Sequence, residues 1–491
     1  MSLNKIQKYA VLIALISLVM RLLMIGNHDL LVEEAYYWNY ATHLDFGYLD
    51  HPPMVALLIK LSTLCFGTNE FGVRFPSIVC WSLTALFSYK LTQKINPHAG
   101  LYAVMLLAIL PFFFLHSLVM TPDLPLIVCW SASLYYLYKA LVLSESKAWF
   151  IAGIWLGLGV LSKYSIVLLG PATLIYLILI PKARQWFARK EPYICLLITA
   201  LLSTPVIYWN ATHEWASFLF QSTRRLQEQP TFGFHELVGL FILFLTPVGL
   251  VGFIQLFKKK LPLTIEKRYF LRVFSLTPLI VFSLFSLRHP IKFNWIGPSL
   301  LAITPWLAEL IQEAPIKLFK AWLITAITLL IIYLGFFICV ALGQPEQVNS
   351  KILSKYISWE NLTNQFNAIA MKTGGNPVFV ALDRYNIASE LTFYQTKQLD
   401  NSIINQRYDV FGSDVFGGES LMFRYWRKDN PPLPEKLILI SNNLNDFNNP
   451  VIAQETTVRS KPQMIWAKSQ GMGVNLTPYY YEVVLRHTTR E

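Results

Sequence analysis

The chain has 491 residues, of which 54% are hydrophobic and only 14% are charged. A composition this apolar excludes a disordered chain or an ordinary soluble enzyme and indicates a polytopic membrane protein. The net charge of +12 does not indicate nucleic-acid binding, because +11 of it lies in residues 1–343, among the apolar segments.

Apolar runs long enough to cross about 30 Å of hydrocarbon recur through residues 1–343. They predict about 11 transmembrane helices, followed by a soluble domain over residues 344–491. Lys and Arg concentrate in every second loop, so the positive-inside rule places the N-terminus in the cytoplasm. With an odd number of spans, the C-terminal domain and the first loop, residues 27–72, both lie on the outer side. The predicted spans are 9–26, 73–92, 100–118, 124–143, 148–162, 164–181, 192–210, 236–257, 269–287, 294–312 and 320–342.

The first outer loop combines carboxylates with aromatic rings in the run LLVEEAYYWNYATHLDFGYLDHPP, which begins at Leu30. This mixture suits chemistry at a membrane surface, because a carboxylate can take a proton from a reacting hydroxyl. Glu33 and Glu34 are adjacent and cannot face the same way on a helix, so one is expected to act on a substrate while the other orients it or binds a metal. The alternative is a charge pair that stabilises the start of a helix. The apolar run 54–66 is too short to span and is predicted to lie along the interface.

Two further acidic positions lie on the outer side. Asp50 and His51 precede two prolines, which hold the backbone extended. They suit contacts to a metal or a phosphate, or they form a solvated turn. Asp123 lies at the outer mouth of a helix pair, where an ionisable residue indicates either function or a helix cap.

Cations are scarce in the outer loops, so those present there favour binding of an anion such as phosphate. Lys60 and Arg74 are instead predicted to extend to lipid headgroups. The phosphate candidates are Lys163, Arg224, Arg225, Arg288 and Lys292, with His289 beside Arg288.

The C-terminal domain alternates strand and helix patterns, which predicts a small α/β fold. Runs 376–383 and 436–441 are predicted strands, 386–395 is a predicted helix, and QGMGVNLTPYYYEVVLRH leads into a final strand. The triplet Asp383, Arg384 and Tyr385 is expected to form a lid, an acceptor-binding surface or a packed scaffold. The domain contains no cysteine, so neither a disulfide framework nor a cysteine metal site is expected there.

Seven segments in order carry a family resemblance: EEAYYWNYATHLDFGYLDHPP, FGVRFPS, TPDLPL, LSKYS, WNATHEWASFLFQ, FNWIGP and DRYNIASELTFYQ. Together they resemble the bacterial GT-C glycosyltransferases of the protein-mannosyltransferase-like superfamily, which includes glycosyltransferase family 39 and the aminoarabinose transferases. The resemblance implies a GT-C fold in the bacterial inner membrane. It also implies transfer of a sugar from a polyprenyl-phosphate donor to an envelope acceptor at the periplasmic face, by an inverting displacement. The implied acceptors are lipid A or lipopolysaccharide, a glycan or a protein.

The resemblance also assigns roles to residues. The acidic pair supplies the catalytic base, and Glu33 stands where relatives typically have Asp, so the base is Glu33 or Glu34. His51 replaces a phosphate-binding lysine. No nucleotide cofactor is implied, but a divalent metal of unknown identity is, at Asp50, Asp123 and His289. The implied donor-binding and phosphate-binding residues are His51, Lys163, Arg288, Lys292, Tyr36 and Tyr37.

Two other functions remain open from the sequence. A transporter or flippase for a lipid-linked sugar favours inverted repeats and charges at mid-bilayer. Neither pattern is visible in the sequence. An oligosaccharide ligase that uses a lipid-pyrophosphate donor shares the same residue types.

Overall fold

The computed structural model describes residues 3–223, 229–257, 263–342, 358–427, 433–468 and 475–487. They divide into two compact units, which are described separately. The first unit comprises Met1–Leu23, Phe46–Val55 and Pro76–Tyr333. The second comprises Met24–Asp45, Ala56–Phe75 and Leu334–Glu491, so it joins most of the loop 27–72 to the C-terminal domain. The division predicted at residue 343 follows the end of the apolar runs, whereas the division in the structure follows the contacts between residues.

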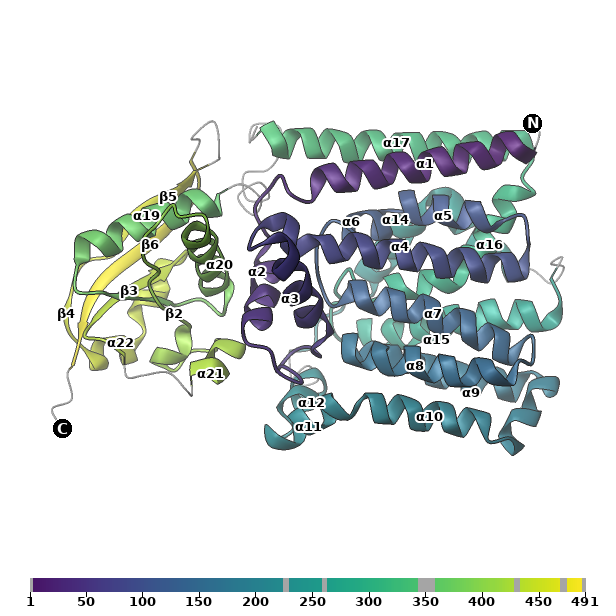
Figure 1. The fold of residues 1–491 in the computed structure, drawn as a ribbon, viewed down its shortest axis with the longest axis horizontal. Helices are drawn as coiled ribbons and strands as arrows, with labels where there is room; N and C mark the ends of the chain where they lie inside the picture. The colour runs from purple at the N-terminus through teal and green to yellow at the C-terminus, as the bar shows by residue number, and fades with distance from the viewer. Residues whose placement is uncertain are drawn as a thin grey trace. The chain divides into compact units, whose positions relative to one another are not determined.

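The first unit is a bundle of apolar helices that run side by side (Figure 1). The described helices are α1 (Leu3–Met24), α4 (Glu70–Ile95, in this unit from Pro76), α5 (Gly100–Ile109), α6 (Pro111–His116), α7 (Asp123–Leu141), α8 (Ser146–Ser162), η1 (Tyr164–Leu168), α9 (Leu169–Leu179), η2 (Pro181–Ala188), α10 (Glu191–Leu202), α11 (Thr204–Thr212), α12 (Ala216–Gln221), α14 (Phe234–Gln255), α15 (Ile265–Ser286), η3 (Gly297–Ser299), α16 (Leu300–Gln312) and α17 (Ile316–Leu342).

Five of the described helices are long and apolar enough to cross a membrane, and seven spans result if two bent pairs each count as one. Two of the apolar runs that gave the prediction of about 11 spans, 100–118 and 192–210, are divided in the structure. The run 100–118 breaks between α5 and α6 at Pro111, where Leu110 is extended, as is expected before a proline. The pair α10 and α11 bends by 48° next to Pro205, which cannot continue the helical hydrogen bonds. The chain is nonetheless a multi-pass helical membrane protein, as predicted.

The second unit contains α2, α3 and the α/β domain. Its described helices are α2 (Val32–Thr42), α3 (Met54–Phe66), α19 (Trp359–Thr373), α20 (Asn386–Asp400), η4 (Ser413–Phe416), α21 (Met422–Trp426), η6 (Leu444–Asn448) and α22 (Pro450–Glu455). Its strands are β1 (Val378–Ala381), β2 (Val410–Phe411), β3 (Lys436–Ser441), β4 (Thr456–Arg459), β5 (Gln463–Lys468) and β6 (Asn475–Arg486). The predicted strands and helix of this domain are confirmed, and α3 begins and ends where the short apolar run does.

The sheet has the order β2-β1-β3-β6-β4, and β5 also pairs with β6. Strands β2, β1 and β3 are parallel, and β6 is antiparallel to β3. Alternate side chains of the parallel strands, including Val378, Val380 and Leu439, form one apolar core with Phe416 and Phe447. All four residues of β1 are buried, as expected for a parallel strand with both faces covered.

Close packing fixes the loop between α15 and α16. A Cβ atom on Gly297 would lie 1.9 Å from the ring of Phe112 on α6.

We predict that Gly297→Ala destabilises the protein by about 1–3 kcal/mol, because the ring must move to admit a methyl group. Thermal unfolding in detergent checks this. Gly239→Ala on α14, where a Cβ meets nothing within 4 Å, is the matched control and should leave the unfolding midpoint unchanged or raise it. An equal loss in both variants would contradict the packing argument.

Candidate functional site

A buried ion pair organises the start of α2. The guanidinium of Arg74 on α4 donates to both carboxylate oxygens of Glu34, with Nη2–Oε2 at 2.7 Å and Nε–Oε1 at 2.9 Å. Neither side chain is exposed. The same carboxylate accepts a hydrogen bond of 2.9 Å from the backbone N–H of Leu31, as the third residue of a helix does in a capping box. Glu34 is therefore an internal structural carboxylate with its acceptor sites in use.

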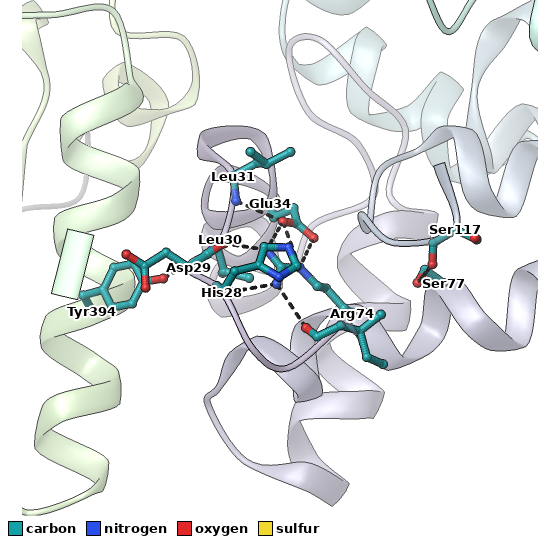
Figure 2. Close-up of polar contacts among 10 residues, drawn as sticks. His28, Asp29, Leu30, Leu31, Glu34, Arg74, Ser77, Ser117 and Tyr394 are labelled. Carbon is teal, nitrogen blue, oxygen red and sulfur yellow. Dashed lines mark hydrogen bonds and ion pairs between the residues drawn. The ribbon is translucent and has the colours of Figure 1, made fainter. Parts of the chain in front are cut away.

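Arg74 also forms hydrogen bonds to the segment that leads into α2. Its remaining N–H groups donate to the backbone carbonyls of Ile25 at 3.0 Å, His28 at 2.9 Å and Asp29 at 2.7 Å. Figure 2 shows the hydrogen bonds that run from this one guanidinium to the Glu34 carboxylate and to the chain just before α2. The prediction that Arg74 extends to lipid headgroups is wrong, because a guanidinium with five fixed donors can satisfy a carboxylate and a carbonyl-lined turn together.

Glu33 has the opposite environment. It lies in the first turn of α2 and is exposed, and no described residue forms a hydrogen bond or ion pair with its carboxylate. The positive end of the helix dipole favours a negative charge at this position. The acidic pair therefore divides into a buried anchor and an exposed carboxylate, one residue apart.

The aromatic residues of α2 are packed inside the second unit. Tyr36 is 1% exposed and Tyr37 is 7% exposed. The ring of Tyr36 lies 4.7 Å from that of Tyr385 and 4.8 Å from that of Tyr40, and its hydroxyl accepts from the N–H of Met422. These rings are part of a core and offer no open face for stacking on a sugar.

Helix α20 of the C-terminal domain holds α2 from the other side. The N–H of Leu30 donates to the hydroxyl of Tyr394 at 2.8 Å, and the side-chain amide of Asn39 donates to the carbonyl of Ser389 at 3.2 Å. Lys397 pairs with Glu70 at 2.9 Å. The C-terminal domain thus fixes the helix that carries Glu33.

The triplet Asp383, Arg384 and Tyr385 was expected to form a lid, an acceptor-binding surface or a packed scaffold, and its contacts favour the scaffold. Asp383 accepts from the N–H of Asn386 at 2.7 Å and so caps α20. Arg384 pairs with Glu419 at 2.7 Å, and Tyr385 packs against Tyr36.

Two buried carboxyls accompany these contacts. Asp29 accepts from the N–H of Trp359 at 2.7 Å. Burial, with the charge of Glu70 nearby, raises its pKa to about 7. Glu390 on α20 is fully buried, and burial next to Asp29 raises its pKa well above the usual value. A carboxyl in such surroundings is stable in its neutral form.

A second polar cluster lies in the first unit. Lys163, directly after α8, donates to one oxygen of Asp123 at 2.7 Å, and the side-chain amide of Asn294 donates to the other at 2.6 Å. Asp123 is 2% exposed, whereas the Lys163 side chain is 15% exposed. Asp123 therefore fixes the position of a partly accessible ammonium group.

The loop that supplies Asn294 also carries the predicted cations. Arg288 and Lys292 are exposed, whereas His289 is 5% exposed, with its ring 5.1 Å from that of Phe285. Arg224 and Arg225 lie outside the described residues. The loop around Asp50 and His51 is tied down through its backbone. The carbonyl of Asp50 accepts from the side-chain amide of Gln221, and the carbonyl of His51 accepts from the N–H of Tyr48.

The predicted metal ligands are not assembled. Within the described residues, no group of three His, Cys, Asp or Glu side chains could hold a metal ion. Both oxygens of Asp123 are used by Lys163 and Asn294, and the buried ring of His289 packs on Phe285. This donor set does not fit a divalent ion at Asp50, Asp123 and His289.

Part of the chain is similar in sequence to known proteins. Residues 50–209 match the sequence model of a family described as dolichyl-phosphate-mannose-protein mannosyltransferase. The chain is 27% identical over 188 residues to lipid A galacturonosyltransferase RgtD of Rhizobium johnstonii, covering 38% of this chain and 39% of the relative. It is 28% identical over 185 residues to undecaprenyl phosphate-alpha-4-amino-4-deoxy-L-arabinose arabinosyl transferase 2 of Proteus mirabilis, covering 36% and 33%. Each match thus spans less than half of the curated relative.

The fold is similar over almost the whole chain to that of a solved structure. ArnT from Cupriavidus metallidurans, bound to undecaprenyl phosphate, superposes with a TM-score of 0.67 at 14% identity, over 98% of both chains. The chain has the GT-C fold. The family resemblance and the fold class predicted from the sequence are confirmed.

Two residues that organise the described structure were not predicted in their roles: Arg74 was assigned to lipid headgroups, and Asn294 was not singled out. Arg74 stands in the quoted motif FGVRFPS and Asn294 in FNWIGP. The residues around Arg74 and Asn294 form no local pattern that indicates the partner. That partner lies 40 residues away for Arg74 and 171 residues away for Asn294. The signal available was the rarity of Arg outside the basic loops.

The GT-C protein should depend strongly on its buried ion pair. We predict that Arg74→Gln lowers the free energy of unfolding by about 3–5 kcal/mol, because it leaves the Glu34 carboxylate buried without its counter-charge. Chemical or thermal unfolding measures the loss. Arg384→Gln, which breaks an exposed pair with Glu419, is the control and should cost less than about 1 kcal/mol. Equal effects would contradict a special role for the buried pair.

Asp29 should make stability depend on pH. Its pKa is raised in the folded state, to about 7, from about 3.9 when unfolded. Between these values the folded state retains a proton that the unfolded state releases, so stability falls as pH rises from about 4 to about 7 and is then constant for this group. We predict that the fall in unfolding midpoint from pH 5 to pH 8 is smaller in Asp29→Asn than in the natural chain. Parallel curves for the two proteins would refute this.

Proposed function

We propose that this chain is a membrane glycosyltransferase that moves a sugar from a polyprenyl-phosphate donor to an acceptor at the periplasmic face. The fold shared with ArnT, whose solved structure carries undecaprenyl phosphate, supports this proposal. So do the printed names of the relatives, which are a lipid A galacturonosyltransferase and an arabinosyl transferase. The observation that carries it is the division of the acidic pair, in which Arg74 binds Glu34 and Glu33 stays exposed.

In the proposed reaction Glu33 is the general base. Its carboxylate takes the proton of an acceptor hydroxyl as the hydroxyl oxygen attacks the anomeric carbon. The new C–O bond forms as the bond to the lipid phosphate breaks on the opposite face, so the configuration inverts. Glu34 and Arg74 contribute by holding the first turn of α2 in place, since a fixed base lowers the entropic cost of reaching the reactive geometry.

The departing phosphate needs positive charge. Lys163 supports this role, because Asp123 uses one of its three ammonium donors and the side chain remains partly exposed. Arg288 and Lys292 are exposed on the loop that carries Asn294 and are assigned to the same anion. The donor set of Asp123 does not fit a metal, so these cations carry the stabilisation of charge.

The acceptor is proposed to be a lipid-anchored glycan of the lipid A type, in line with the printed names of the relatives. The enzyme is placed in the bacterial inner membrane with its N-terminus in the cytoplasm and its C-terminal domain in the periplasm. The distribution of Lys and Arg among the loops supports this orientation.

The assignment of Glu33 as the general base predicts the effect of replacing its carboxylate with an amide. We expect Glu33→Gln to lower the transfer rate by about 10²–10⁴-fold, the usual contribution of a positioned base. The measurement is release of undecaprenyl phosphate from a lipid-linked sugar by the purified protein. The unfolding midpoint should change little, because the Glu33 side chain is exposed and loss of its interaction with the helix dipole costs less than about 1 kcal/mol.

Glu236→Gln is the matched control. Glu236 is also exposed in the first turn of a helix, α14, and its substitution should leave the rate unchanged. Full activity of Glu33→Gln would remove the base assignment. Uptake of lipid-linked sugar without release of undecaprenyl phosphate by the natural chain would favour a flippase instead.

A further inference from the structure

A cavity of about 320 Å³ lies at one edge of the sheet in the second unit. Its walls come from the segments that follow three strands: Leu382 after β1, Ser413 after β2, and the loop 442–449 after β3. Because β2, β1 and β3 are parallel, their carboxyl ends meet at this edge. The chain leaves β1 for β2 on one side and then reaches β3 on the other. Open α/β sheets bind ligands at such a switch point.

The cavity is rich in amide groups. The loop after β3 reads NNLNDFNN, and four of its residues line the cavity: Asn445, Asp446, Asn448 and Asn449. A side-chain amide offers both donors and an acceptor, and a carboxylate accepts. Among the lining residues, none is Lys, Arg or His. This lining suits a neutral ligand with many hydroxyl groups and disfavours an anion.

Hydrogen bonds hold the loop in shape. Asp446 accepts from the hydroxyl of Ser441 at 2.5 Å and from the side-chain amide of Asn443 at 3.2 Å. Asn449 donates to the carbonyl of Phe416 at 3.1 Å, which ties the segment after β3 to the segment after β2. A wall fixed in this way needs little ordering when a ligand binds.

Two amides remain available for a ligand. Asn445 and Asn448 are exposed, and no described residue forms a hydrogen bond with their side-chain amides. The volume lies at the small end of the range of about 300–1,000 Å³ typical of ligand pockets. One monosaccharide unit is the ligand that such a volume and such groups suit.

We propose that this cavity is a binding site for a neutral sugar unit, held chiefly by the side-chain amides of Asn445 and Asn448. The site stands on the cavity and its lining, and it does not depend on the transferase activity proposed above.

The test uses the full-length protein in detergent, titrated with galactose, glucose and N-acetylglucosamine, with galacturonate as the anionic comparison. Isothermal titration calorimetry or saturation-transfer NMR reports binding. We expect at least one neutral sugar to bind saturably and galacturonate to bind at least tenfold more weakly. The Asn445→Ala/Asn448→Ala double variant should weaken binding of the neutral sugar at least tenfold, while its unfolding midpoint stays unchanged.

Asn442→Ala is the matched control, because Asn442 is exposed on the same loop and does not line the cavity. It should bind as the natural chain does. Glu33→Gln should also bind the sugar normally, so loss of transfer and loss of this site are separable. The proposal is overturned if no neutral sugar binds saturably, or if the double variant binds as well as the natural chain.

Discussion

The described structure depends most on one interaction, the buried pair of Glu34 and Arg74. Burying two charges is costly unless their geometry and remaining hydrogen bonds are nearly ideal. Here the guanidinium meets both carboxylate oxygens and three backbone carbonyls, and the carboxylate also caps α2. The pair fixes where α2 begins, and with it the direction in which the neighbouring Glu33 leaves the helix.

Much of the fold could be predicted because its signals are local. The apolar run 54–66 and the strand 436–441 agree with α3 and β3 to the residue. The breaks within the apolar runs could not be predicted in this way. Hydropathy registers a continuous apolar run across Pro111, whereas the backbone breaks there. The short strand β2 has two residues, too few to show a period, and it forms only because β1 offers a parallel edge.

The residues of the candidate site could be predicted from their types, whereas the residues that they contact could be predicted less well. The sequence singled out Glu33, Glu34, Asp123 and Lys163 because charge is rare beside apolar segments. The pairing of Lys163 with Asp123 could not be predicted, because the sequence around a long flexible side chain does not indicate which residue it contacts on another helix. Arg74 was also treated as a surface residue, because burial of a charge is decided by tertiary contacts that no local pattern encodes. Tyr36 and Tyr37 were assigned to binding although their rings complete a core.

The contacts between α2 and α20 join two parts of the chain that the ribosome synthesises at widely separated times. Leu30 and Tyr394 are 364 positions apart, and Asn39 and Ser389 are 350 positions apart. Loop closure over such separations is slow and comes after local structure has formed. During synthesis α2 leaves the ribosome long before its partner, so the helix that carries Glu33 acquires its final support only once almost the entire polypeptide has been translated. A truncated or stalled product therefore lacks the contacts that hold α2.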